Sequence, residues 1–189
     1  MRTALVKSMI AAGLLAAAPA SAQTYEVDTR HSHMSWSIPH LGISTYRGKF
    51  ARTSGKLTID RAAKTGSVDI TVDPASQMSG DDRLDKHLAS EDFFHVAKFP
   101  AITFKSTKVH FSGDNPTRVD GELTMLGITR PVALQVTLFR CIEHPRLKKE
   151  VCGGDATATI RRSEWGMKYG LPGLIDEVKL DLQVEAYRQ

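Results

Sequence analysis

Long runs in which apolar and polar residues alternate constrain the fold of this chain most strongly. In the last such run, Val178, Leu180, Leu182 and Val184 alternate with charged or amide residues. Since successive side chains of a β-strand point to opposite faces, this pattern predicts strands with one apolar face. Clusters of turn-forming residues separate the runs. Together they predict strands over residues 24–29, 33–39, 46–60, 67–73, 101–111, 117–126, 131–141, 151–162 and 176–188.

Eight or nine antiparallel strands of this kind must bury their apolar faces together. They can do so by packing as two sheets or by closing into a barrel. The long runs at 46–60 and 176–188 favour the barrel, because long strands can curl around it. We therefore predict an all-β fold, and the periodicity alone leaves the sandwich open as the alternative.

One segment, about residues 80–95, interrupts the alternation and predicts a short helical insert. Ser79 is followed three residues later by Asp82, which resembles a capping box at a helix start. Leu84 and Leu88 then fall four residues apart, on one side of the helix. A short amphipathic helix must rest on an apolar surface, so we expect this segment to cover the open end of the sheet as a lid.

The first 22 residues predict a cleaved secretory signal peptide. Arg2 and Lys7 precede an apolar run that is too short to span a bilayer, and small residues at 20–22 form a cleavage site. The expected mature chain is a single domain of residues 23–189 in the periplasm, with no transmembrane anchor. Removal of Arg2 and Lys7 lowers the formal net charge of +4 by two. With no run of basic residues, nucleic acid is not an expected partner.

Two cysteines, Cys141 and Cys152, both lie in the exported part of the chain. An even number of cysteines in an oxidising compartment favours a disulfide. A redox pair would need a C-x-x-C spacing, which the chain lacks. We therefore predict a structural disulfide between them.

Several motifs resemble those of the YceI-like, polyisoprenoid-binding family of bacterial exported proteins. They are H-S-x-x-x-W-x-I-x-H-L-G-I-S (31–44), D-K-H-L-x-S-x-D-F-F with K-F-P-x-I-T-F (85–104), G-E-L-T-M-L-G-I-T-R-P-V (121–132) and R-S-E-W-G-M (162–167). The resemblance spans nearly the whole mature chain. It implies an eight-stranded antiparallel, lipocalin-like barrel whose apolar interior holds an isoprenoid quinone or a polyprenyl phosphate.

The resemblance implies a lipid-binding protein that carries, stores or protects its ligand and is not an enzyme. The bound isoprenoid lipid or quinone is the ligand, and no further cofactor is expected. We predict that apolar residues of the barrel interior and the lid contact the lipid tail. These residues are Trp36, Ile38, Phe50, Val68, Ile70, Val72, Leu84, Leu88, Phe93, Phe94, Phe104, Leu123, Met125, Leu180 and Leu182.

The histidines are the candidates for recognition of the lipid headgroup. His31, His40 and His87 match family positions, and an imidazole can donate to a quinone carbonyl or pair with a phosphate. We expect them to meet at the mouth of the barrel. The alternative is a metal site in which His31 and His33 share one face of a strand and a third ligand comes from elsewhere. No metal is expected, since two ligands at this spacing are common by chance.

Two other functions stay open. An enzyme acting on the lipid would use a His/Asp site, and Asp81, Asp82 and Asp85 are the acidic candidates. These carboxylates alternate with Arg83 and a lysine, which is typical of a solvated helix face. A ligand-free, stress-protective module is the second alternative. Edge pairing of two barrels would give a homodimer.

Overall fold

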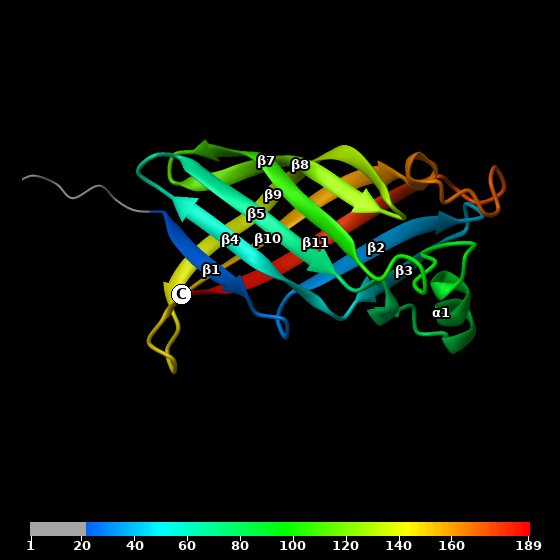
Figure 1. Ribbon diagram of the computed structural model, residues 1–189, viewed down its shortest axis with the longest axis horizontal. Helices are drawn as coiled ribbons and strands as arrows, with labels where there is room; N and C mark the ends of the chain where they lie inside the picture. The colour runs from blue at the N-terminus through cyan, green and yellow to red at the C-terminus, as the bar shows by residue number, and fades with distance from the viewer. Residues whose placement is uncertain (1–21) are drawn as a thin grey trace, which may run out of the picture.

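The computed structural model describes residues 22–189 and shows an all-β barrel with one short α-helix (Figure 1). The predicted signal peptide, residues 1–22, lies outside the described residues except for Ala22. The strands are β1 (Gln23–Val27), β2 (His33–His40), β3 (Ser44–Phe50), β4 (Thr53–Asp60), β5 (Thr65–Val72), β6 (Gln77–Met78), β7 (Ile102–Ser112), β8 (Asn115–Met125), β9 (Ile128–Glu143), β10 (Glu150–Arg161) and β11 (Glu177–Arg188).

Eight of these strands close an antiparallel ring, which confirms the predicted barrel. The order is β1-β4-β5-β7-β8-β9-β10-β11, and β1 pairs again with β11. β11 is long enough to pair with two different strands, β1 and β2, along the same edge. Its last residues pair with β1, and residues 179–183 pair with β2. β2 then continues into β3 and the two-residue β6, which lie outside the closed ring.

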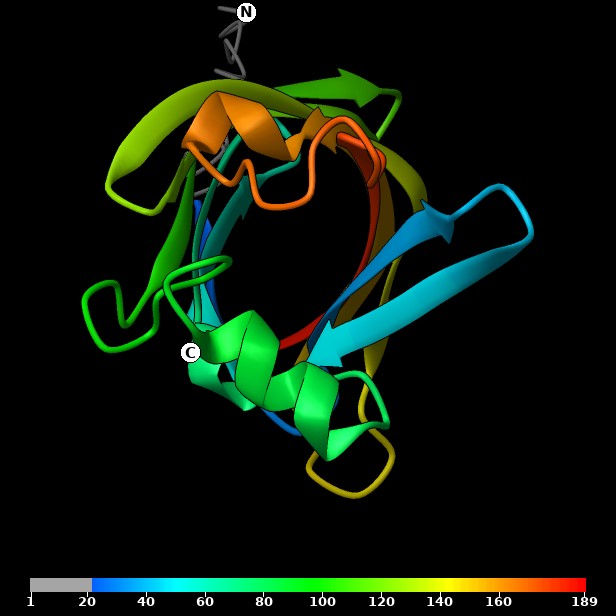
Figure 2. The same ribbon diagram turned by 90° about the vertical axis from the view of Figure 1, so that its right-hand side faces the viewer.

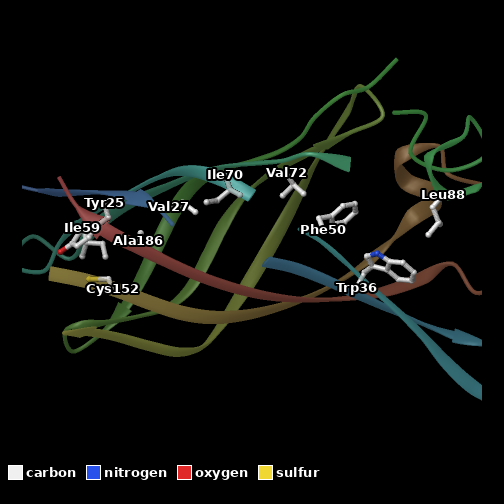
Figure 3. Close-up of a cluster of buried hydrophobic side chains, with 10 residues drawn as sticks. All are labelled: Tyr25, Val27, Trp36, Phe50, Ile59, Ile70, Val72, Leu88, Cys152 and Ala186. Carbon is white, nitrogen blue, oxygen red and sulfur yellow. The ribbon is translucent and has the colours of Figure 1, made fainter. Parts of the chain in front are cut away.

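The alternation predicts the direction of the side chains correctly. On β5, Ile70 and Val72 are buried inside the barrel, whereas Asp69 is exposed. One cluster of buried apolar side chains follows the barrel from end to end (Figure 3). Tyr25 and Cys152 lie near one end of this cluster, and Trp36 and Leu88 lie near the other.

The prediction of one continuous strand over residues 46–60 is wrong. The chain breaks between β3 and β4, because the backbone at this point bonds to the 3-10 turn η1 (Pro74–Ser76). The amide of Ala51 donates to the Ser76 carbonyl, and the amide of Arg52 donates to the Ser76 hydroxyl. The Arg52 guanidinium also binds the carboxylate of Asp73 at 2.7 and 2.8 Å. These contacts replace the ladder and turn the chain from the β2–β3 extension into the ring.

The end of the barrel near the C-terminus carries a part-buried hydrogen-bonded group and a disulfide. The Tyr25 hydroxyl donates to Glu150 at 3.1 Å, and Arg61 donates to the other carboxylate oxygen of Glu150 at 3.2 Å. Burial, and then the charge of Glu150, raise the pKa of Tyr25. The predicted Cys141–Cys152 disulfide is confirmed and joins β9 to β10. Closing this short loop contributes about 3 kcal/mol by chain entropy.

The opposite end carries the helix α1 (Asp82–Ala89). Its N-cap is Asp81, whose carboxylate accepts from the amides of Arg83 and Leu84 at 2.8 and 3.4 Å. The helix is therefore shorter than the predicted 80–95 segment, and residues 91–94 and 96–98 form turns. Figure 2 looks onto this end, where α1 crosses one side of the opening and the chain after the 3-10 turn η2 (Arg162–Trp165) arches over the other. We call this end the mouth. Within residues 22–189, no helix has both the length and the apolar character needed to span a bilayer.

Candidate binding site inside the barrel

The interior of the barrel is only partly filled by side chains. A cavity of about 360 Å³, here called the outer cavity, lies beneath α1 at the mouth. A second cavity of about 120 Å³, the inner cavity, lies deeper, between the ring strands. Met34 on β2 lines both. The two spaces therefore follow one another along the barrel, with the flexible Met34 side chain at their junction.

The walls of both cavities are almost entirely apolar. In the outer cavity, Leu84 and Leu88 of α1, together with Phe93 and Phe94, face strands β2, β8 and β11. Phe94 packs edge-on against Phe50, with 5.3 Å between the ring centroids. The inner cavity has one charged lining residue, Asp155. Such a space suits a slender apolar chain.

All of the predicted tail-binding residues line one of these cavities. The inner cavity is lined by Val68, Ile70, Phe104 and Leu182. The outer cavity is lined by Trp36, Ile38, Phe50, Val72, Leu84, Leu88, Phe93, Phe94, Leu123, Met125 and Leu180.

Two glycines let large rings lie flat against the barrel wall. A Cβ on Gly48 would overlap the indole of Trp36, and a Cβ on Gly121 would overlap the ring of Phe104. Gly48 lies opposite Trp36 in the β2–β3 pair, and Gly121 lies beside the β7 strand that carries Phe104. The missing side chains provide the space in which these two rings pack.

The structure does not bring the three predicted headgroup histidines together. His40 and His87 line the outer cavity, but His31 does not. His31 lies in the turn before β2, where its Nδ1 is 2.6 Å from the Asp28 carboxylate. This hydrogen bond raises the pKa of His31. β2 runs from His33 to His40 and spans roughly 23 Å at about 3.3 Å per residue, and His31 lies beyond the end of the strand that is distant from His40.

The alternative metal site needs His31 and His33 on one face of a strand, and the structure does not place them so. His31 precedes β2 and His33 begins it, so they do not share one strand face. Among residues 22–189, the one group of three neighbouring ligand types is Cys141, Glu150 and Cys152, and its two sulfurs are bonded to each other.

His87 connects the lid to the opposite side of the mouth. Its Nε2 is 2.9 Å from the Asp92 carboxylate. Its ring packs in a T-shaped arrangement against the rings of Phe93 and Tyr169, with 4.9 Å between the centroids in each pair. Because Tyr169 belongs to the segment after η2, this aromatic group bridges the two sides of the mouth.

Asp85 is a structural anchor of the lid rather than part of a solvated face. Its carboxylate accepts hydrogen bonds from the Gln77 side chain at 2.9 Å and from the Ser79 amide at 2.7 Å. Burial raises the pKa of Asp85, but the hydrogen bonds from Ser79 and Gln77 outweigh it, and the net pKa is lowered. Asp81 caps the helix, and the exposed Asp82 remains the solvated member.

We expect Asp85→Ala to loosen the lid by about 2 kcal/mol, because it removes hydrogen bonds to a charged acceptor. Amide hydrogen exchange over residues 82–89 should accelerate roughly 30-fold at neutral pH. Since the folded pKa is lowered, the stabilisation is present above the unfolded value near 3.9 and is lost as the pH falls through the folded pKa. Asp82→Ala, on the exposed side of the same helix, is the control. Equal exchange in the two variants would contradict this role for Asp85.

Several cavity residues carry no clear signal in the sequence. Tyr169 and Leu174 lie in the irregular segment between η2 and β11, where no periodicity predicts a direction. Arg162 also lines the outer cavity, although an arginine is expected to be exposed. Met34 alternates with Trp36 and was detectable as an inward residue by that spacing. What the spacing does not reveal is that Met34 borders both cavities.

Comparisons with known proteins agree with this architecture. A family model for the YceI-like domain matches residues 25–186. A UPF0312 protein of Shewanella putrefaciens is 34% identical over 192 residues, an alignment that covers 100% of both chains.

Solved structures share the barrel. The crystal structure of BcnA from Burkholderia cenocepacia has a TM-score of 0.70 at 26% identity, covering 85% of this chain and 99% of BcnA. A polyisoprenoid binding domain from Saccharophagus degradans has a TM-score of 0.65 and covers 87% of this chain and 98% of its own. At 14% identity, the latter comparison shows the fold alone.

Proposed function

Because this chain belongs to the YceI-like family, we propose that it is an exported protein that holds one long-chain isoprenoid amphiphile, a quinone or a polyprenyl phosphate, inside its barrel. The observation that carries the proposal is the pair of apolar cavities arranged in series along the barrel. A packed structural module has no need of such unfilled space, which costs packing energy.

The apolar lining supplies the energy for binding. Each buried methylene group of a lipid tail contributes about 0.8 kcal/mol. A tail that runs from the outer cavity past Met34 into the inner cavity gains this energy along its whole length. Affinity then depends on chain length more than on any single polar contact.

The polar groups favour one orientation of the lipid. His40, His87 and Arg162 line the outer cavity at the mouth, whereas the inner cavity contains no basic residue in the described part of the chain. We place the headgroup at the mouth and the end of the tail in the inner cavity. The lid formed by α1 then covers the ligand. The Saccharophagus degradans domain, which is named for polyisoprenoid binding, gives a precedent for this use of the fold.

The proposal is tested by purifying the protein, expressed with its own N-terminal segment, from the periplasm of a Gram-negative host without detergent. Native mass spectrometry should find a chain that begins at Gln23 and carries one lipid, and solvent extraction should identify a prenyl compound. The same spectrum reports whether the protein is a monomer or a homodimer.

Failure to recover a lipid, together with no uptake of added quinone or polyprenyl phosphate, would overturn the proposal. Recovery of a chemically altered lipid after incubation would favour an enzyme that uses the His87–Asp92 pair. A full-length chain that stays in the cytoplasm would contradict the export step alone.

A further inference from the structure

Arg162 is a buried cation whose hydrogen-bonding capacity is only partly used. Its side chain is 3% exposed and lines the outer cavity. Nε donates to the Ile175 carbonyl and Nη1 donates to the Met167 carbonyl, each at 3.1 Å. The remaining nitrogen, Nη2, is buried and has no partner among residues 22–189. A guanidinium that served only to tie this segment together would leave two N–H donors of Nη2 unsatisfied.

No carboxylate balances the charge of this guanidinium by direct contact. Asp176 is the acid whose charge acts on Arg162, but its oxygens accept from the Ser163 amide and hydroxyl at 2.8 and 2.7 Å. Among the described residues, Arg162 forms no ion pair. Burying an unpaired charge is costly unless something compensates for it. Burial accordingly lowers the pKa of Arg162 from its usual value.

The outer cavity is lined by basic side chains and by no acidic ones among the described residues. Within the described part of the chain, its lining includes Arg162, His40 and His87 but no Asp or Glu. A second buried donor without a partner, the indole Nε1 of Trp36, lines the same cavity. Both unpartnered nitrogens therefore require an acceptor, and the positive charge of Arg162 favours a negative one.

We propose that Arg162 binds the anionic group of the ligand, through Nη2, and that the protein prefers amphiphiles with a terminal phosphate or carboxylate to neutral ones of the same chain length. This inference rests on the proposed lipid-binding function and adds the chemical class of the headgroup. The apolar chain supplies most of the affinity, and Arg162 selects which end group the mouth accepts. A neutral quinone carbonyl would satisfy the donors of Nη2 but leave the buried charge unbalanced.

The experiment compares a long-chain fatty acid with the alcohol of the same length, and a polyprenyl monophosphate with its alcohol. Dissociation constants are measured by calorimetry at pH 8, below the concentration at which the ligands aggregate. We expect the wild-type protein to bind each anion about 10- to 100-fold more tightly than its alcohol. In Arg162→Gln, which keeps a donor but removes the charge, this ratio should fall towards one. Arg162→Lys should retain part of the preference.

Arg161→Gln is the matched control, because Arg161 is the exposed neighbour and does not line the cavity. Its anion-to-alcohol ratio should equal that of the wild type. A wild-type ratio near one would overturn the inference while leaving lipid binding intact, and this result needs no variant to fold. An equal loss of affinity for both ligands in Arg162→Gln would also overturn it, since that is the effect of a purely structural arginine.

If no amphiphile binds, the proposed function fails as well. Binding of inorganic phosphate with the affinity of the prenyl phosphate would show a free-anion site instead of a headgroup site.

Discussion

Met34→Trp is expected to weaken the binding of a long-chain lipid far more than the binding of a short one. Met34 borders both the outer and the inner cavity, so a tail that fills both must pass it. The unbranched methionine can move aside, whereas a rigid indole at this position would fill the junction. Each methylene group excluded from the inner cavity costs about 0.8 kcal/mol, so four of them would reduce affinity by roughly 200-fold.

The measurement is a series of dissociation constants for one headgroup with chains of increasing length. In the wild type, affinity should keep rising with length, and in Met34→Trp it should reach a plateau at the length that fills the outer cavity. Met78→Trp introduces the same side chain at a residue that is 52% exposed and lines neither cavity. The two empty spaces beside Met34 can accept part of the indole, so folding should be retained. An equal loss at every chain length would show that the tail does not pass Met34.

Gly55→Ala is expected to destabilise the barrel by at least about 3 kcal/mol. Gly55 lies in β4 opposite Ile70 of β5, and its φ of +148° is a conformation that L side chains rarely adopt. A Cβ at this position would overlap the Asp69 carbonyl oxygen and approach the Ile70 Cα at 2.9 Å. Because these are backbone atoms, no rotamer change can relieve the overlap, and the β4–β5 ladder must separate.

Thermal unfolding of the apo protein tests this prediction. For a domain of this size, the loss corresponds to a melting temperature lowered by roughly 6–12 °C. Gly153→Ala is the matched control, since Gly153 also lies inside a strand. A Cβ there would meet Glu185 Cγ at 3.4 Å and the Val184 carbonyl at 3.5 Å, which are ordinary contacts. Similar melting temperatures for the two variants would contradict the steric reason given for Gly55.

Most of the fold could be predicted from the alternation of residue types. The predicted strands agree with the observed ones to within about three residues, apart from the run at 46–60. That run failed because its break depends on Ser76 and Asp73, which contact Arg52 from more than 20 residues away. Periodicity reports the local chain and contains no information on such a contact.

The candidate site was predictable to the extent that it depends on strand direction. Ile70 and Leu123 face inward, as do the apolar residues two positions away on the same strand. The grouping of histidines was not predictable in the same way. His31 lies in the turn before β2 and His40 ends that strand, and only the folded chain places His40 with His87 at the mouth. Tyr169 reaches the same place from a loop whose path follows no repeat.

The all-β class, the inward faces of the strands, the short helix and the disulfide could be predicted from the chain alone. Each of these follows from residue type and spacing over a short stretch of chain. The folded structure was needed to show that the interior keeps two cavities in series and that Met34 lies at their junction. It was also needed to show that Arg162 is buried beside the outer cavity without an ion pair among residues 22–189. These features depend on how the volumes and charges of residues from distant strands add up in one space, which no local pattern encodes.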